Sequence, residues 1–300
     1  MNQAKQDATR RWLGLGPAIL LIVIFMVIPL FIISVYSFLE SNPYGGIRPH
    51  FSFDAYFQFL FEYDFDDNLV FNSAYLMICW RSFVLALATT ILCLLIGFPV
   101  AYYIAMQPPS KRNLFLFLVT IPFWTNLLIR TFSWILILRD AGVVNNILMW
   151  TGIIDKPITL LYTNGAILIG LVYTYIPFIV LPIYATVEKL DLRLFEAAHD
   201  LYANRRQLMR HIILPLTAPG IIAGGILVFV PSLGAFIAPN LLGGGKKLML
   251  GSLIQLQFSS ARNWPFGSAI ALILMAAVLI AMLIYILGPA GKTDIGEHAG

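Results

Sequence analysis

Apolar residues fill six stretches of this chain, and polar residues gather between them. A membrane-spanning helix needs about 20 mainly apolar residues. The six stretches cover residues 13–39, 72–106, 114–138, 165–187, 216–240 and 268–287. The pattern predicts an all-α integral membrane protein with six transmembrane helices. It divides the chain into a tail (1–12), a first helix (13–39), a polar loop (40–71), a membrane core (72–287) and a second tail (288–300).

Most of the six stretches contain proline. A proline inside a soluble helix costs about 3 kcal/mol. In a membrane, neighbouring helices and bound water can satisfy the freed carbonyls. Kinked helices of this kind leave room for a pathway between them. The prolines are Pro17, Pro29, Pro99, Pro122, Pro177, Pro182 and Pro231.

One polar segment inside the predicted core, residues 188–215, has the pattern of an amphipathic helix. Leu190, Leu194, Ala197, Ala198 and Leu201 recur at helical spacing, so apolar residues share one face. The segment is not a span, because each of its charges would cost several kcal/mol in lipid. Either it lies as a solvated loop on the headgroups, or it forms a contact surface. Its charged residues from position 189 onward are Lys189, Asp191, Arg193, Glu196, Asp200, Arg205, Arg206 and Arg210.

Composition supports the membrane prediction. Apolar residues make up 59% of the chain and charged residues only 11%, whereas a soluble domain carries about 25% charged residues. The net charge of +4 does not indicate nucleic acid, because the positive residues cluster beside the spans, where they set orientation. Cys79 and Cys93 are fourteen residues apart in one apolar stretch, about 21 Å along a helix, which excludes a disulfide.

The distribution of Lys and Arg predicts the orientation. With the N-terminus inside, eleven of these residues fall in inner segments and six in outer ones. The excess favours cytoplasmic termini and a cytoplasmic 188–215 segment. Residues 40–71 then form a periplasmic loop, in which aromatic residues alternate with acidic ones. A solvated acidic loop is one interpretation, but so many aromatics favour a small packed cap. After Glu40, which begins the loop, the acidic residues are Asp54, Glu62, Asp64, Asp66 and Asp67.

Catalytic, nucleotide-binding and metal-binding patterns are missing from the sequence. The run Gly243–Lys247 looks like a phosphate loop, but no Ser or Thr follows the lysine. No Asp or Glu lies inside the six stretches, which disfavours a proton- or sodium-coupled carrier. We therefore expect a non-catalytic protein with no cofactor and no metal.

The third stretch carries the most polar chemistry. Asn126, Arg130 and Ser133 are spaced at i, i+4 and i+7, which predicts one polar stripe on a helix flanked by Trp124 and Trp134. Two interpretations remain open. The arginine reaches the headgroups or the carbonyls of a kinked neighbour, or the stripe lines a substrate path.

The segment from Glu196 to Pro215 resembles the signature cytoplasmic loop of permease subunits of bacterial binding-protein-dependent ABC importers. The resemblance rests on Glu196-Ala197-Ala198 and, at matching spacing, Ile212-x-Leu214-Pro215. It implies two short helices that dock on an ATPase subunit, with Glu196 and Asp200 making charged contacts and Leu194, Ala198 and Leu201 filling its groove. Tyr202 stands where the family usually has Gly, and we expect it to avoid a left-handed turn.

The region from Ile121 to Tyr184 looks like the spermidine/putrescine branch of these permeases. The similarity is carried by Phe123-Trp124-Thr125, Leu128-Ile129-Arg130-Thr131 and Pro177-Phe178-Ile179-Val180-Leu181-Pro182. It implies a type I importer permease (MetI-like) in the bacterial inner membrane. The implied partners are a second permease, two ATP-binding subunits, a periplasmic solute-binding protein and membrane lipid.

The cargo is less constrained than the class. Polyamines are cations, for which carboxylates and aromatic faces are suited. Asn240 stands where polyamine permeases often have an acidic residue, just before Leu241-Leu242-Gly243-Gly244. We include Asn240 with the candidate path residues. The alternatives are another small organic solute, such as an amino-acid derivative, or a secondary carrier.

Overall fold

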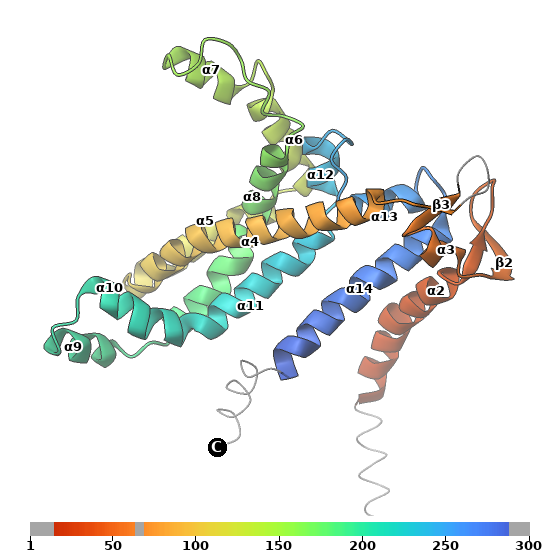
Figure 1. The fold of residues 1–300 in the computed structure, drawn as a ribbon. Helices are drawn as coiled ribbons and strands as arrows, with labels where there is room; N and C mark the ends of the chain where they lie inside the picture. Colours follow the sequence, from red (N-terminus) through yellow and green to blue (C-terminus); the bar gives the residue numbers. More distant parts are fainter. Residues whose placement is uncertain (1–14, 64–68, 288–300) are drawn as a thin grey trace, which may run out of the picture. The chain divides into compact units, whose positions relative to one another are not determined.

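The computed structural model of this chain describes residues 15–63 and 69–287, and within them it is mostly helical (Figure 1). The helices are η1 (Val23–Val27, a π-helical turn), α2 (Ile28–Tyr36), α3 (Asp54–Phe57), α4 (Ala74–Ala105), α5 (Pro109–Trp124), α6 (Leu127–Leu138), α7 (Val143–Trp150), α8 (Asn164–Val187), α9 (Leu192–Asp200), α10 (Arg205–Leu208), η2 (Met209–Ile213, also π-helical), α11 (Leu214–Leu233), α12 (Ile237–Leu242), α13 (Leu250–Phe258) and α14 (Trp264–Leu287). The strands are β1 (Leu39–Ser41), β2 (Ile47–Phe51), β3 (Phe61–Tyr63) and β4 (Leu69–Phe71). The predicted tails, 1–12 and 288–300, lie outside the described residues.

Five helices of the described chain are long and apolar enough to cross a membrane. They are Leu15–Tyr36, Ala74–Ala105, Asn164–Val187, Arg205–Leu233 and Trp264–Tyr285. The remaining predicted span, the third, is broken: Pro109–Trp124 and the helical segment that begins at Leu127 meet at 88°. If this bent pair is taken as one span, the prediction of six spans is confirmed.

The chain divides into two compact units. In the described residues, unit one contains 15–63, 69–75 and 254–284, and unit two contains 76–253 and 285–287. The predicted core of residues 72–287 is therefore divided between them, because α14 groups with the first span and the first loop.

Unit one contains a small cap built from the first loop and the start of α14. β1 pairs with β2 and β3 pairs with β4, each antiparallel. The ring of Phe38 packs against Phe51, Phe53 and Tyr56 at 5.3–5.8 Å between centroids. The rings contact one another around Phe38, but the expectation that the loop aromatics would be buried is wrong for Tyr44, Phe51, Phe53 and Phe57, which are all exposed. The acidic residues Asp64, Asp66 and Asp67 lie outside the described residues.

Hydrogen bonds tie this cap to residues just before α14. The amide of Gly46 donates to the carbonyl of Arg262 at 2.9 Å, and the Asn263 side chain donates to that of Gln58 at 3.2 Å. The ring of Phe266, fully buried, meets Tyr75 at 4.9 Å. Unit one is therefore held together by contacts between segments about 200 residues apart in sequence.

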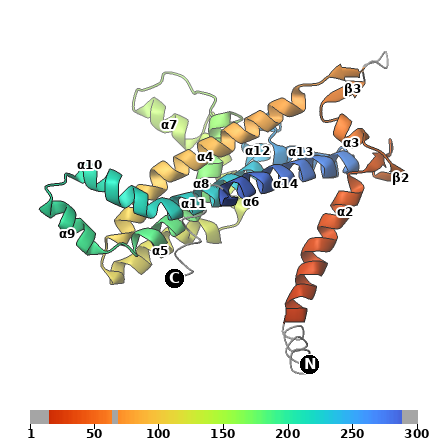
Figure 2. The ribbon, with the colours of Figure 1, turned by 60° about the horizontal axis from the view of Figure 1, so that its bottom comes forward.

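Unit two is organised around the close packing of α8 against α11, which lie side by side in both views (Figures 1 and 2). Small residues make this approach possible. A Cβ atom added at Gly224 would lie 3.2 Å from the backbone of Ile179, and one added at Gly220 would lie 2.7 Å from the carbonyl oxygen of Pro182. Two backbones that come this close leave no room for larger residues at these positions.

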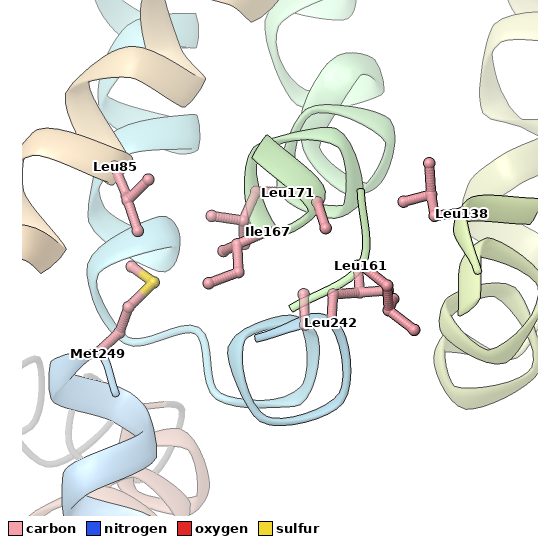
Figure 3. Packing of buried hydrophobic residues seen from close by; sticks show 9 residues of the cluster. Leu85, Leu138, Leu161, Ile167, Leu171, Leu242 and Met249 are labelled. Atoms are coloured by element: carbon pink, nitrogen blue, oxygen red, sulfur yellow. The ribbon is translucent and has the colours of Figure 1, made fainter. Parts of the chain in front are cut away.

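A cluster of buried apolar residues lies at the end of unit two formed by α12 and the start of α8 (Figure 3). Ile167 and Leu171 of α8 meet Leu242 of α12, and Met249 lies toward Leu85 of α4. The amide of Leu250 donates to the Ser82 hydroxyl at 2.8 Å, which joins the start of α13 to α4. The short helices α12 and α13 are thus integral to the packing, although the hydropathy pattern did not predict them as separate elements.

Both π-helical turns precede a proline. Pro29 follows η1 and Pro215 follows η2. A proline in a helix has no N–H to donate, and its ring clashes with the carbonyl four residues earlier. That carbonyl belongs to Phe25 or His211, inside the respective π turn, and the wider turn accommodates the ring.

Candidate functional site

The amphipathic segment forms two short helices, α9 and α10, which lie beyond the ends of α4 and α8 in unit two (Figures 1 and 2). The start of each helix is set by a local polar contact. The carboxylate of Asp191 accepts from the Arg193 amide at 2.9 Å. Asn204 and Gln207 exchange side chain-to-backbone hydrogen bonds at 2.8 and 2.9 Å, a capping box that fixes the first turn of α10.

The second half of the segment continues into the fifth span. α10, η2 and α11 form one uninterrupted helical run from Arg205 to Leu233. Leu214 and Pro215, predicted to end the loop, are both exposed and lie in the first turn of α11. We call residues 190–213 the coupling segment.

One face of the coupling segment packs against its own chain. Ala198, Leu208 and Ile213 are buried together, with Phe98 and Tyr102 of α4 against them. Ala198 is only 5% exposed. The prediction that Ala198 fills a groove of a partner is therefore wrong, because that side chain supports α9 from within.

The opposite face of α9 is open. Glu196 and Asp200 are exposed on that face, Ala197 is exposed at its edge, and Leu194, one turn before Ala198 on the packed side, is 41% exposed. Leu201, directly after the helix, is 82% exposed. These residues of the predicted coupling set remain available for a partner.

Tyr202 ends α9 in the left-handed conformation, with φ of 57°. The amide of Ala203 donates to the carbonyl of Ala198 at 2.9 Å, the bond of a Schellman turn. The expectation that Tyr202 would avoid a left-handed turn is wrong. Closing the turn and burying Ala198 outweigh the roughly 1–2 kcal/mol that this conformation costs a residue with a Cβ atom.

An ion pair joins the helices next to the coupling segment. The guanidinium of Arg112 in α5 lies 3.0 Å from the carboxylate of Glu188, which follows α8. The Nε of Arg112 also donates to the Gln107 carbonyl at 2.6 Å. These contacts fix the end of α8 from which the coupling segment begins.

The third predicted span bends at Thr125 and Asn126. The Asn126 side chain accepts from the Leu128 amide at 2.8 Å and so caps α6 as a new helix. Asn126 is therefore not the first member of a stripe on a continuous helix. The amide of Arg130 donates to the Asn126 carbonyl at 3.1 Å, so the predicted i, i+4, i+7 spacing with Arg130 and Ser133 applies to α6 and its cap and not to one straight span.

Arg130 spans the bend between α5 and α6. Its guanidinium donates to the carbonyl of Pro122 at the end of α5, and its Cζ lies 5.5 Å from the ring centroid of Tyr173 in α8. The interpretation that Arg130 binds a freed carbonyl agrees with this geometry, although the carbonyl belongs to the preceding helix and not to a neighbour. A substrate-path role is a separate proposal.

The other candidate path residues occupy different places. Trp134 packs edge-to-face on Tyr173 at 5.7 Å, while Trp124 is 78% exposed. Ser133 donates to its own helix at 2.9 Å. Asn240 lies in α12 and not at the end of the fifth span, which stops at Leu233. Arg130 and Trp134 share a partner, Tyr173.

A cavity of about 160 Å³ lies where α6 begins, beside the middle of α8 and the end of α11. None of its lining residues is charged, and the aromatic ones are Tyr175 and Phe236. The Tyr175 hydroxyl donates to the Pro231 carbonyl at 3.1 Å. Sequence reasoning missed Tyr173 and Tyr175; the available signal was two tyrosines, two residues apart, inside a mainly apolar span.

Across residues 15–63 and 69–287, no three His, Cys, Asp or Glu side chains come together as a metal site would require. The fold and site together define a polytopic helical membrane protein with an amphipathic contact segment outside its spans, a class to which transport permeases belong.

The chain belongs to the family of binding-protein-dependent transport system inner membrane components, whose profile matches residues 94–288. The chain is accordingly a multi-pass inner-membrane permease, a transport subunit and not an enzyme. The predicted family and fold class are confirmed.

Relatives agree over most of the chain. It is 40% identical over 264 residues to the spermidine/putrescine transport system permease protein PotB of Escherichia coli (strain K12), covering 88% of this chain and 92% of that one. With PotB of Haemophilus influenzae (strain ATCC 51907 / DSM 11121 / KW20 / Rd) the identity is 47% over 223 residues, or 74% and 77% of the two chains.

Solved structures share the fold. A bacterial ABC transporter involved in the import of the acidic polysaccharide alginate superposes with a TM-score of 0.67 at 19% identity, covering 94% of this chain and 96% of the other. The same kind of transporter in complex with an alginate pentasaccharide-bound periplasmic protein gives a TM-score of 0.66 at 21% identity, covering 93% and 96%.

Proposed function

We propose that this chain is one permease subunit of an ATP-driven importer of polyamines. The observation that carries the cargo is the 40% identity to a spermidine/putrescine permease over 88% of the chain. The cargo also suits the chemistry of the site, since an alkyl ammonium is attracted to aromatic faces such as those of Tyr175 and Phe236.

The proposed assembly contains a second, different permease, two ATP-binding subunits and a periplasmic solute-binding protein. The coupling segment is the contact for an ATP-binding subunit, through Leu194, Glu196, Ala197, Asp200 and Leu201. Its opposite face supports this role, because α9 is fixed to α4 through Ala198 and moves with the spans.

Both termini and the coupling segment face the cytoplasm in this proposal, in keeping with the excess of Lys and Arg in those segments. Closure of the ATP-binding subunits would carry the coupling segment with it and switch the pathway between inward- and outward-facing states. Asn126, Arg130, Trp134 and Asn240 remain candidate path residues within that cycle, as do Trp124 and Ser133.

The test is reconstitution of the complete importer in proteoliposomes. ATP-dependent uptake of labelled putrescine or spermidine, delivered by the solute-binding protein, is the expected result. Uptake of an amino-acid derivative in place of polyamines would support the importer assignment and reject the polyamine cargo. That substrate is included because Asn240 is uncharged where polyamine permeases often carry an acidic residue. Uptake that persists without any ATP-binding subunit would instead indicate a secondary carrier.

Orientation is tested separately. A cysteine in place of exposed Arg206, in a background lacking Cys79 and Cys93, should react with an impermeant maleimide only after the cytoplasmic side is opened. A matched cysteine at exposed Tyr44 should react from the periplasm in intact spheroplasts. The opposite pattern would place the coupling segment away from ATP.

A further inference from the structure

Three non-glycine residues of the described chain have a left-handed backbone: Tyr162 with φ of 62°, Tyr202 with φ of 57° and Arg262 with φ of 51°. Such a conformation costs a residue with a Cβ atom roughly 1–2 kcal/mol. It persists where surrounding contacts hold it, and it concentrates at functional positions. The three residues differ in the contacts that hold each of them in this conformation.

Two of the three are held by their own chain. The amide of Tyr162 donates to the Leu242 carbonyl at 2.8 Å, and its ring packs so closely on Gly244 that a Cβ added there would clash with the ring. The carbonyl of Arg262 accepts from Gly46 at 2.9 Å, and its side chain packs closely on Gly45. In both cases the backbone makes a hydrogen bond and the side chain packs against another segment of the chain.

Tyr202 differs, because its side chain is 96% exposed. The turn requires a left-handed residue, since the Ala203 amide must reach the Ala198 carbonyl. Glycine would supply that conformation without strain. The tyrosine ring, in contrast, contributes no packing to the described part of the chain, so folding of that part does not account for its presence.

The ring also stands beside a second apolar side chain. Leu201 is 82% exposed, and together Leu201 and Tyr202 form a pair that we call the apolar knob. Exposed carboxylates of Glu196 and Asp200 lie on the helix that leads to it. A buried aromatic anchor surrounded by polar contacts is the arrangement that dominates the affinity of protein interfaces.

We propose that Tyr202 is an anchor for the ATP-binding subunit and inserts, with Leu201, into an apolar pocket on that subunit whose rim is basic near Glu196 and Asp200. The inference rests on the proposed function, which assigns the coupling segment to that partner. A protein pocket is favoured over an anionic lipid surface, because Tyr202 lies between Asp200 and the arginines Arg205 and Arg206, a mixture of charges, whereas anionic headgroups attract clusters of basic residues.

Loss of the Tyr202 side chain should change the stability of the permease and its affinity for the ATP-binding subunit in opposite directions. Tyr202→Gly removes the strain and should leave the melting temperature of the permease equal or higher. The same substitution removes the anchor and should weaken the ATP-binding subunit's affinity about tenfold or more, a loss typical of aromatic anchors. Tyr202→Phe keeps the ring and should retain affinity within about twofold.

The experiment measures the affinity of the ATP-binding subunit for the complete permease pair in nanodiscs of neutral lipid. Tyr202→Ala serves as a second variant, because it lacks the ring but keeps the strained backbone; it should lose affinity as Tyr202→Gly does. Tyr162→Gly is the matched control, a strained tyrosine outside the coupling segment, and should lower the melting temperature without changing affinity.

The outcomes are distinct. Wild-type affinity in both Tyr202→Gly and Tyr202→Ala would overturn the anchor while leaving the proposed function intact. A loss of affinity that appears only when anionic lipid is added would assign the ring to the membrane and also overturn it. A wild-type permease pair that binds no ATP-binding subunit would reject the proposed function itself.

Discussion

The guanidinium of Arg130 donates a hydrogen bond to the carbonyl of Pro122 across an 88° bend between two helices. The same carbonyl accepts from the Thr125 hydroxyl at 2.8 Å. The end of α5 is thereby satisfied without a continuing helix, and the face of Tyr173 lies against the charge. Arg130 stabilises the bend whether or not it also meets a substrate.

Replacing Arg130 should loosen this bend. Arg130→Met keeps the length of the side chain and removes its donors, and hydrogen bonds from charged groups contribute about 1.5–3 kcal/mol. We expect a lower melting temperature in detergent and slower uptake. Arg81→Met is the matched control, because Arg81 reaches the Leu248 carbonyl only at 3.5 Å; an equal loss in both variants would contradict a specific role for Arg130.

Reversing the charge of Glu196 should uncouple the transporter. Glu196 is exposed on α9, so Glu196→Lys is expected to leave the melting temperature unchanged while abolishing ATP-dependent uptake. Uptake and ATP hydrolysis are measured in the same proteoliposomes. Arg193→Glu, an exposed charge reversal on the same helix, is the control for general electrostatic effects, and wild-type uptake by Glu196→Lys would count against the proposed contact.

A methyl group should be tolerated at Gly225 but not at Gly220. An added Cβ at Gly220 would lie 2.7 Å from the Pro182 carbonyl oxygen, whereas at Gly225 the nearest atom, in Thr90, is 3.8 Å away. Overpacking costs about 1–3 kcal/mol, so Gly220→Ala should melt earlier. Gly225→Ala should melt at the wild-type temperature or above, because Ala lowers the entropy of the unfolded chain. Equal melting temperatures would show that α8 and α11 are not closely packed.

The Arg112–Glu188 pair should contribute modestly. The two side chains are 26% and 42% exposed, and exposed ion pairs contribute about 0.2–1 kcal/mol. A double-mutant cycle with Arg112→Gln and Glu188→Gln should give a coupling energy in that range, smaller at high salt. Arg112→Gln should cost more than Glu188→Gln, because Arg112 also donates to the Gln107 carbonyl at 2.6 Å.

Hydropathy predicted the spans because lipid requires long apolar runs. Each run contains a long helix or, for the third, a bent pair, although the fifth run extends past the end of α11 into α12. Hydropathy could not predict the bend, because the segments on both sides of the break are apolar. It does not report whether the helix axis continues straight or turns. The available signal was a proline near a helix end, Pro122, followed by a capping residue at a helix start, Asn126, two residues before Leu128.

The conformation of Tyr202 was predicted wrongly for a different reason. Residue preference disfavours a left-handed tyrosine, but the turn is imposed by contacts distant in sequence, which bury Ala198 against α4 and bring Ala203 beside it. Likewise, which face of α9 is available to a partner follows from packing against Phe98 and Tyr102, which the amphipathic pattern alone does not reveal.

The helical run from Arg205 to Leu233 has 29 residues, a length of about 43 Å at 1.5 Å per residue. Its capping box lies beside the coupling segment, and its last turn borders the cavity lined by Tyr175 and Phe236. Because no flexible linker interrupts this run, a displacement of one end is transmitted to the other end with little loss. Movement of the ATP-binding subunit and the change in width of the cavity would then occur together. A glycine inserted near Met209 would interrupt the helix, so that the second movement would lag behind the first.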